Sequence, residues 1–184
     1  FSYDYNPSID KKPPQELGFE NVIDQRVVNV ALFGIDSRSK GFKGNSDSIM
    51  ILSVNTGTGD IKLVSVMRDS LVNMVKQSNG KTPNPNKINS AYARGGATYA
   101  IKVLNENFGL DIQKAITVNF FGMSDIIDAV GGIEYYVPAD MNYDDDYQDL
   151  HIHLKAGYQL LDGDKAEQYV RCRNIYPSGD LGRI

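Results

Sequence analysis

The chain has 184 residues, which is enough for one substantial domain. Its 41% hydrophobic and 23% charged residues are ordinary for a globular domain and argue against global disorder. The net charge of -4 disfavours non-specific nucleic-acid binding. The one cysteine, Cys172, excludes an intrachain disulfide, and no apolar run reaches the roughly 18 residues of a membrane span.

The first part of the chain predicts a lead-in followed by three strands. Residues 1–18 are polar and contain several prolines, which favours an irregular lead-in or tether. The β-branched and aliphatic run at 27–33 predicts a buried strand that ends at Gly34. The runs at 48–54 and 61–66 predict two further strands, and the turn-rich connection between them indicates a hairpin.

The rest of the chain alternates between predicted helices and strands. Apolar residues at helical spacing over 97–107 end at Gly109, which suits a helix C-terminus. Ser124 is the expected N-cap of a second helix that stops at Gly131. The acidic and aromatic segment 139–149 indicates an exposed loop. Further strands are predicted at 115–120 and 133–137, and a third helix at 164–171. This alternation predicts an α/β fold, a single domain with a mixed central sheet covered by helices.

Two acidic residues are tied to the first two predicted strands. Asp36 follows the first strand, and Asp47 lies just before the second. If these strand ends meet in one sheet, two carboxylates lie side by side, which suits Mg²⁺ completed by water or phosphate oxygens. Arg38 lies beside the first acid and suits a phosphate. Because aspartate is also common at turns, a purely structural role for both acids stays open.

Other basic residues could bind an anion. Arg68 stands at a strand end, either as a phosphate clamp or as a surface partner of the adjacent Asp69. Arg171, Arg173 and Arg183 gather near the C-terminus. They indicate either an anion site or a basic helix end that offsets the helix dipole.

Several catalytic and metal motifs find little support. His151 and His153 form an HxH pair that could bind a metal, but no third histidine or cysteine stands near it, so surface polarity is the favoured interpretation. Cys172 has no histidine partner suggested by the sequence and is interpreted as structural. The chain has no Walker-type loop, GxGxxG or GxSxG.

Taken together and in order, the motifs resemble those of the LytR-CpsA-Psr family. The resemblance runs from about Val27 to Ile184, within an expected catalytic domain over 19–184. The matching pieces are GIDSR, SDSIMIL, SVMRDS, KINSAYARGG, VGGIEYYVP, AGYQLLDGDKAEQYVRCR and GDLGR.

The resemblance implies a membrane-anchored phosphotransferase on the outer face of the cytoplasmic membrane of Gram-positive cells. Such proteins move a glycopolymer, such as wall teichoic acid or capsular polysaccharide, from an undecaprenyl pyrophosphate carrier to peptidoglycan. It implies that Asp36 and Asp47 associate with Mg²⁺, or with Mn²⁺ in its place. It implies phosphate contacts at Arg38, Arg68, Arg171, Arg173 and Arg183, and an apolar groove for the lipid between the sheet and its helices.

The chain departs from the family pattern at three places. Asn45 stands where many members have Arg, and Met67 stands where many have Pro. Members usually continue past the last Arg, so we expect the C-terminal part of the domain to be truncated here. Two alternatives stay open: a module that binds polyprenyl glycolipid without transfer, and a polyprenyl pyrophosphatase. Asp47 and Asp69 are the candidates for a general base.

Overall fold

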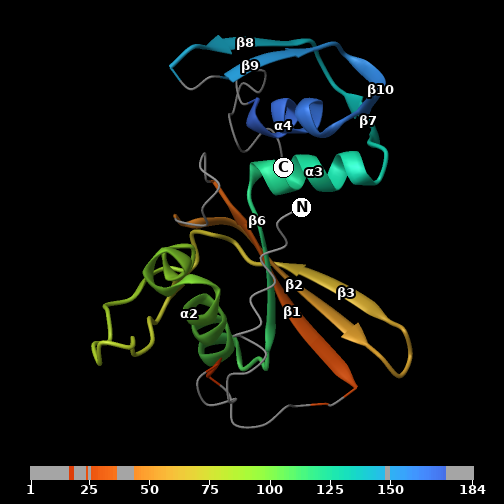
Figure 1. Ribbon diagram of the computed structural model, residues 1–184. Coiled ribbons are helices and arrows are strands. Elements are labelled where there is room, and N and C mark those ends of the chain that lie inside the picture. The colour runs from red at the N-terminus through yellow and green to blue at the C-terminus, as the bar shows by residue number, and fades with distance from the viewer. Residues whose placement is uncertain (1–16, 19–23, 25, 37–43, 148–149, 173–184) are drawn as a thin grey trace. The chain divides into compact units, whose positions relative to one another are not determined.

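The computed structural model describes residues 17–18, 24, 26–36, 44–147 and 150–172. The chain divides after Asn119 into two compact units, and each has its own hydrophobic core. We call them the N-terminal unit and the C-terminal unit and describe each by itself (Figure 1). None of the helices in the described ranges is both long enough and apolar enough to cross a membrane.

A mixed four-stranded sheet forms the frame of the N-terminal unit. Its strands are β1 (Val27–Ile35), β2 (Ser46–Asn55), β3 (Ile61–Ser65) and β6 (Lys114–Val118), in the order β3-β2-β1-β6. β1 pairs antiparallel with β2 and parallel with β6, and β2 and β3 form the predicted hairpin. The predicted α/β class with a mixed central sheet is confirmed. A separate short ladder joins β4 (Leu71–Val72) to β5 (Asn86–Lys87).

The two faces of this sheet differ, because side chains alternate along each strand. On one face Ala31, Phe33, Ile49 and Ile51 are buried in the core together with residues of helix α2 (Ser90–Phe108), which lies against the sheet in Figure 1. The opposite face is also apolar but far less buried. It carries Leu32, Met50, Leu52, Leu63 and Ile116, of which Leu63 is 58% exposed and Ile116 is 42% exposed.

Helix α2 is broken at a glycine pair. Gly95 and Gly96 have non-helical backbone angles, and Gly96 has a positive φ of 65° that disfavours side chains. The sequence predicted only the segment after this break, because the glycines interrupt the helical pattern. The predicted end is confirmed: Gly109 adopts the left-handed conformation, and its N–H donates to the Asn105 carbonyl.

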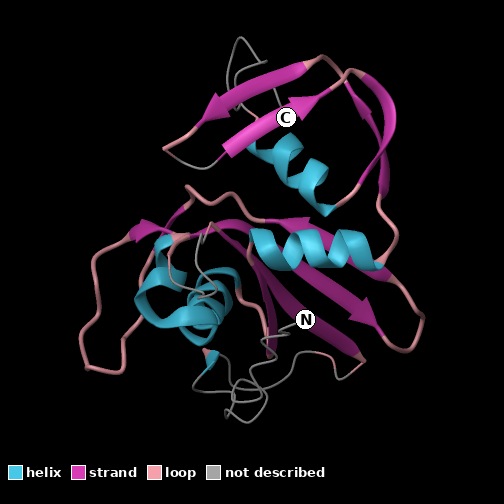
Figure 2. Ribbon diagram, turned by 45° about the horizontal axis from the view of Figure 1, so that its top comes forward, coloured by secondary structure: helices cyan, strands magenta, loops and turns pink. Residues whose placement is uncertain are grey.

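The C-terminal unit packs its strands against its last helix, which also packs against its first helix. Its elements are α3 (Phe120–Ala129), β7 (Ile133–Val137), β8 (Met141–Asp145), β9 (Leu150–Leu154), β10 (Gly157–Leu161) and α4 (Gly163–Arg171). β7 pairs with β10 and β8 pairs with β9, both antiparallel. Figure 2 shows these strands in magenta curving around α4. α4 approaches α3 so closely at Gly163 that a Cβ there would lie 2.5 Å from the Ser124 carbonyl oxygen.

Several element boundaries predicted from sequence are wrong. β1 continues through Gly34 to Ile35, with an irregularity between the two. α3 starts at Phe120, so Ser124 is not its N-cap; its hydroxyl donates to the Gly163 carbonyl at 3.1 Å. Residues 139–149 are not simply a loop, because β8 and the start of the β8–β9 hairpin lie there.

The extent of the lead-in stays a prediction, since residues 1–16 lie outside the described residues. Leu17, at its predicted end, belongs to the hydrophobic core and is only 1% exposed. Its carbonyl accepts a 2.7 Å hydrogen bond from the side chain of Asn105. The structured part of the N-terminal unit therefore includes this residue.

Candidate functional site

The ends of β1 and β2 bring the two predicted carboxylates to one edge of the sheet. Ile35 pairs with Ser46 in the antiparallel register. Asp36 follows the first of these residues and Asp47 follows the second, and both acids are exposed. The prediction that the two strand ends meet is therefore confirmed. The close approach needs Gly34, because a Cβ there would lie 2.9 Å from the Cβ of Ser48 on β2.

Arg68 lies within reach of two carboxylates at this edge. Its Nη1 donates to Oδ1 of Asp47 at 3.0 Å, and its Nε lies 3.5 Å from Oδ2 of Asp69. The contact with Asp69 confirms the interpretation of Arg68 as a partner of the adjacent acid, whereas its role as a phosphate clamp stays a prediction. Arg68 also pairs with Asp47 from another strand. Its side chain is 42% exposed, so its guanidinium remains open to a ligand.

Lys87 extends the same network and was not singled out from sequence. Its Nζ lies 2.6 Å from Oδ1 of Asp69. This hydrogen bond is the main reason that the pKa of Asp69 lies below its ordinary value of 3.8, with a smaller contribution from Arg68. Charges therefore alternate along Asp47, Arg68, Asp69 and Lys87. The signal for Lys87 was its place at the head of the KINSAYARGG motif.

Backbone hydrogen bonds hold these segments together. The Asn89 N–H donates to the Arg68 carbonyl, and the Ser46 N–H donates to the Asn89 carbonyl, both at 3.2 Å. The Ile88 N–H donates to the Ser70 carbonyl at 2.9 Å. The start of β2, the turn that carries Arg68 and the segment before α2 therefore form one connected frame. These hydrogen bonds fix the backbone positions from which the charged side chains extend, although the side chains themselves are exposed.

The carboxylates fit a hard divalent cation. Asp36 and Asp47 offer oxygen ligands from neighbouring strand ends. Arg68 donates a hydrogen bond to Oδ1 of Asp47, so Oδ2 of Asp47 is available to a metal ion. In the described ranges no three or more His, Cys, Asp or Glu residues are placed to share a metal ion. Two carboxylates without a full protein cage suit Mg²⁺, which keeps water or phosphate oxygens as its other ligands.

Arg171 belongs to the C-terminal unit, at the end of α4. Its Nη1 donates to Oε1 of Glu167 at 2.9 Å, and its guanidinium lies 5.6 Å from the centre of the Phe120 ring. Asp162 caps the start of this helix by accepting from the Lys165 N–H at 2.9 Å. Because α4 ends at Arg171 and Cys172 is extended, the chain leaves the helix at this point.

Three predicted site residues, Arg38, Arg173 and Arg183, lie outside the described residues. Their proposed phosphate contacts stay predictions, as does that of Arg171. The N-terminal unit brings together Asp36, Asp47 and Arg68 of the predicted set and adds Lys87.

The HxH pair surrounds an acid on the β8–β9 hairpin. His151 Nδ1 and His153 Nε2 lie 2.8 and 3.1 Å from the same oxygen of Asp144. The hydrogen bond with His151 is the first cause that lowers the pKa of Asp144. The apolar residues that alternate with the histidines, Leu150, Ile152 and Leu154, are buried. The histidines therefore lie on the outer face of the hairpin, as the surface interpretation expected.

The comparisons with known proteins decide the family. The model of the LytR_cpsA_psr family matches residues 3–184. The chain belongs to the LytR-CpsA-Psr family. It is 33% identical over 157 residues to "polyisoprenyl-teichoic acid--peptidoglycan teichoic acid transferase TagV" of Bacillus subtilis, which covers 84% of this chain and 39% of the relative. It is 37% identical over 164 residues to the TagU protein of the same description from Bacillus anthracis, covering 89% of this chain and 50% of the relative.

The fold of this LytR-CpsA-Psr chain agrees with a solved relative. The crystal structure of B. subtilis TagV superposes with a TM-score of 0.67 at 30% identity, covering 88% of this chain and 60% of that chain. The chain thus spans about half or less of the length of the curated relatives named above.

Proposed function

We propose that this LytR-CpsA-Psr chain carries the phosphate-binding part of a transferase. The enzyme moves a glycopolymer of the teichoic-acid class from a polyisoprenyl pyrophosphate carrier to peptidoglycan. The observation that carries this proposal is the cluster of Asp36, Asp47, Arg68 and Lys87 at one exposed edge of the sheet. The names of the TagV and TagU relatives support the donor and the acceptor.

The cationic side chains of this cluster are proposed to bind the phosphate groups of the substrate. Arg68 presents a planar fork that suits phosphate oxygens, and Lys87 adds a second cation through the shared Asp69. The acceptor hydroxyl of peptidoglycan forms a bond to the sugar-linked phosphorus while the bond from that phosphorus to the bridging oxygen of the diphosphate breaks. Negative charge therefore grows on the leaving lipid monophosphate. Fixed cations stabilise that charge more in the transition state than in the ground state, which lowers the barrier.

Asp36 and Asp47 would hold Mg²⁺ beside these cations, with Mn²⁺ as a substitute. When bound, the ion neutralises charge on phosphate oxygens and orients them. Arg38, Arg171, Arg173 and Arg183 are proposed as further phosphate contacts on the family resemblance. Asp47 and Asp69 remain the candidates for the base that accepts the proton of the acceptor hydroxyl.

The polyisoprenyl chain would lie on the apolar sheet face that α2 leaves uncovered. On this face Leu63 is 58% exposed and Ile116 is 42% exposed, so both leave apolar surface open to solvent. A lipid that covers them gains about 25 cal/mol for each Å² of apolar surface removed from water. Because one substrate is a membrane lipid and the other is the cell wall, we place the reaction at the outer face of the cytoplasmic membrane, with membrane anchoring.

One residue favours a second candidate, a module that binds the glycolipid without transfer. Asn45, next to the acidic edge, supplies no charge where many family members have Arg. One cation fewer weakens the hold on the diphosphate, which affects transfer more than binding of the lipid chain.

Product analysis separates these functions. The protein is incubated with a synthetic polyprenyl-pyrophosphate glycan, with and without Mg²⁺ and with and without peptidoglycan fragments. A transferase releases the carrier and labels the peptidoglycan, and does so only when metal is present. Release without an acceptor indicates a pyrophosphatase, and binding without release indicates a module; either result overturns the proposal.

A further inference from the structure

A cationic pocket lies in the N-terminal unit between α2 and the segment that precedes β5. It has a volume of about 430 Å³ and is lined by residues 76–79 and by α2 residues around the helix break. Three of the lining side chains are cations: Lys76, Arg94 and Lys102. None of the lining residues is acidic, although the whole chain has a net charge of -4. The pocket therefore concentrates positive charge on an otherwise acidic protein.

The walls of this pocket are fixed by buried contacts. Tyr99 is 8% exposed, and its hydroxyl donates to the Val75 carbonyl at 2.8 Å, which ties α2 to the chain just before Lys76. Burial raises the pKa of this hydroxyl, so it stays protonated as a donor. The next residues form a turn, in which the Gln77 N–H donates to the Lys81 carbonyl at 2.9 Å.

Most of the positive charge in the pocket is not neutralised by the described part of the protein. Lys102 lies 3.8 Å from Glu106, a long distance for an ion pair. Lys76 and Arg94 make no ion pair with any residue in the described ranges. Ser78, Asn79 and Thr98 add neutral side chains that can donate hydrogen bonds. Cations beside such donors suit an oxyanion.

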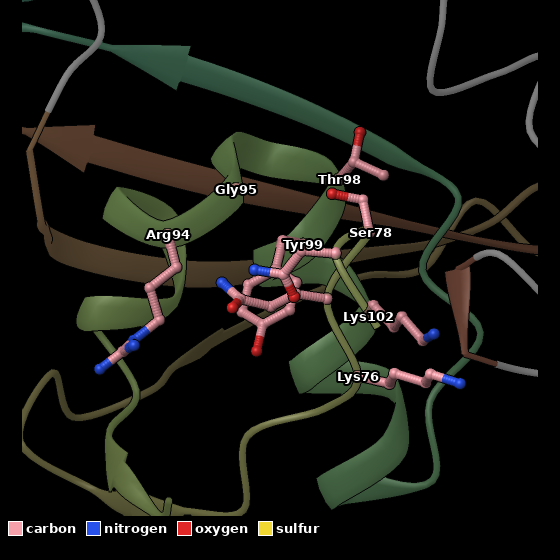
Figure 3. A pocket seen from close by; sticks show the side chains of 9 residues that line it. Lys76, Ser78, Arg94, Gly95, Thr98, Tyr99 and Lys102 are labelled. Carbon is pink, nitrogen blue, oxygen red and sulfur yellow. The ribbon is translucent and has the colours of Figure 1, made fainter. Parts of the chain in front are cut away.

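The cations stand on two sides of the pocket. In Figure 3 the Arg94 guanidinium lies on one side of Tyr99, and Lys76 and Lys102 extend toward the other side. A chain that carries repeated negative charges can contact both.

We propose that this pocket binds the anionic glycopolymer through successive phosphodiester groups along its chain, away from the diphosphate that reacts. The identity of the polymer rests on the proposed function, whereas the binding of repeated phosphodiesters rests on the pocket itself. Phosphate is favoured over carboxylate because it offers more oxygens to the Arg fork and to the hydroxyl and amide donors around it. Such a subsite holds the polymer while its end is transferred and selects phosphate-rich polymers over neutral ones.

The test is a titration of the protein with a short oligo(glycerol phosphate), followed by amide NMR shifts. Inorganic phosphate and an uncharged glycan of similar length serve as comparison probes. We expect the oligomer to shift the amides of residues 76–79 and 94–98. We expect inorganic phosphate to bind more weakly and the uncharged glycan not to bind. Raising the salt concentration weakens the oligomer complex, because exposed charges are screened.

Matched variants locate the site. Lys76→Ala and Arg94→Ala each weaken oligomer binding by about three- to tenfold, the range for one exposed charge contact with an anion. Lys81→Ala removes an exposed lysine from the same turn but outside the pocket, and changes binding by less than about twofold. Preserved amide spectra of each variant show that it is folded. Equal losses at Lys81 and Lys76, or full binding by the folded Lys76→Ala/Arg94→Ala double variant, would overturn the inference.

The outcome is separable from the proposed function. Arg68→Ala should lower transfer by about 10²- to 10³-fold and leave oligomer binding at this pocket intact. If the oligomer binds here but no transfer is detected in any condition, the transferase proposal fails and the binding site stands. If transfer occurs and the pocket variants bind the oligomer normally, the pocket inference fails alone.

Discussion

Replacing Arg68 with alanine should separate catalysis from folding. The structure predicts a small stability cost, because Arg68 is 42% exposed and its Asp47 partner is 41% exposed. Ion pairs of this kind contribute less than about 1 kcal/mol. The cost in transfer is larger, since removing one preorganised donor to a developing negative charge lowers the rate by about 10²- to 10³-fold.

Arg26 provides a matched control. It also pairs with an aspartate, Asp24, at 3.0 Å, and its side chain is 73% exposed. It precedes β1, whereas Asp36 follows that strand, so the two lie at opposite ends. Arg26→Ala should therefore lose a similar surface ion pair without loss of transfer.

The assay measures release of carrier from a polyprenyl-pyrophosphate glycan together with thermal unfolding of each variant. Arg68→Lys keeps the charge but loses the planar fork, so its rate should fall between those of the unmodified protein and Arg68→Ala. The reasoning is refuted if a well-folded Arg68→Ala protein transfers within about threefold of the unmodified rate, since loss of such a donor costs far more than that.

Three further changes test other parts of the structure. Lys87→Ala should raise the pKa of Asp69 toward 3.8, which carboxyl NMR can follow. The lowered pKa of Asp69 stabilises the folded protein above the unfolded-state pKa, and this stabilisation is lost as the pH falls through the folded-state pKa. An unchanged titration of Asp69 in the variant would show that Lys87 is not part of the network. Asn105→Ala should cost about 2–4 kcal/mol in chemical denaturation, because it strips buried partners from Leu17 and Ile112; a cost below about 1 kcal/mol would contradict those contacts. Gly163→Ala should destabilise the protein by about 1–3 kcal/mol, because its Cβ meets the backbone of Ser124; a neutral effect on unfolding would show that α3 and α4 are farther apart.

The apolar strands and the acidic edge could be predicted from sequence because the signals are local. β-branched runs located β1, β2 and β3 within a few residues. The sequence placed the two acids at strand ends that could meet, and the antiparallel pairing of β1 with β2 brings Asp36 near Asp47.

Other features could not be predicted, because they depend on contacts between residues far apart in the sequence or because polar residues hide the pattern of buried ones. On β8 and β9, Asn142, Asp144, His151 and His153 form a polar outer face that hides the alternation of buried residues beneath it. The cap-like signal of Ser124 misplaced the start of α3, because Ser124 lies inside the helix and its hydroxyl donates to the Gly163 carbonyl of α4. Lys87 gains its role only through Asp69, which is remote in sequence and close in space.

The most direct test of the account is a titration with a short prenyl pyrophosphate and Mg²⁺, followed by NMR of backbone amides and the Arg68 side chain. The account predicts shifts concentrated at Asp36, Asp47, Arg68 and Lys87, smaller without Mg²⁺ and absent with the corresponding prenyl alcohol. Shifts that avoid these four residues, or that are equal for the pyrophosphate and the alcohol, would contradict the assignment of this edge as the diphosphate site.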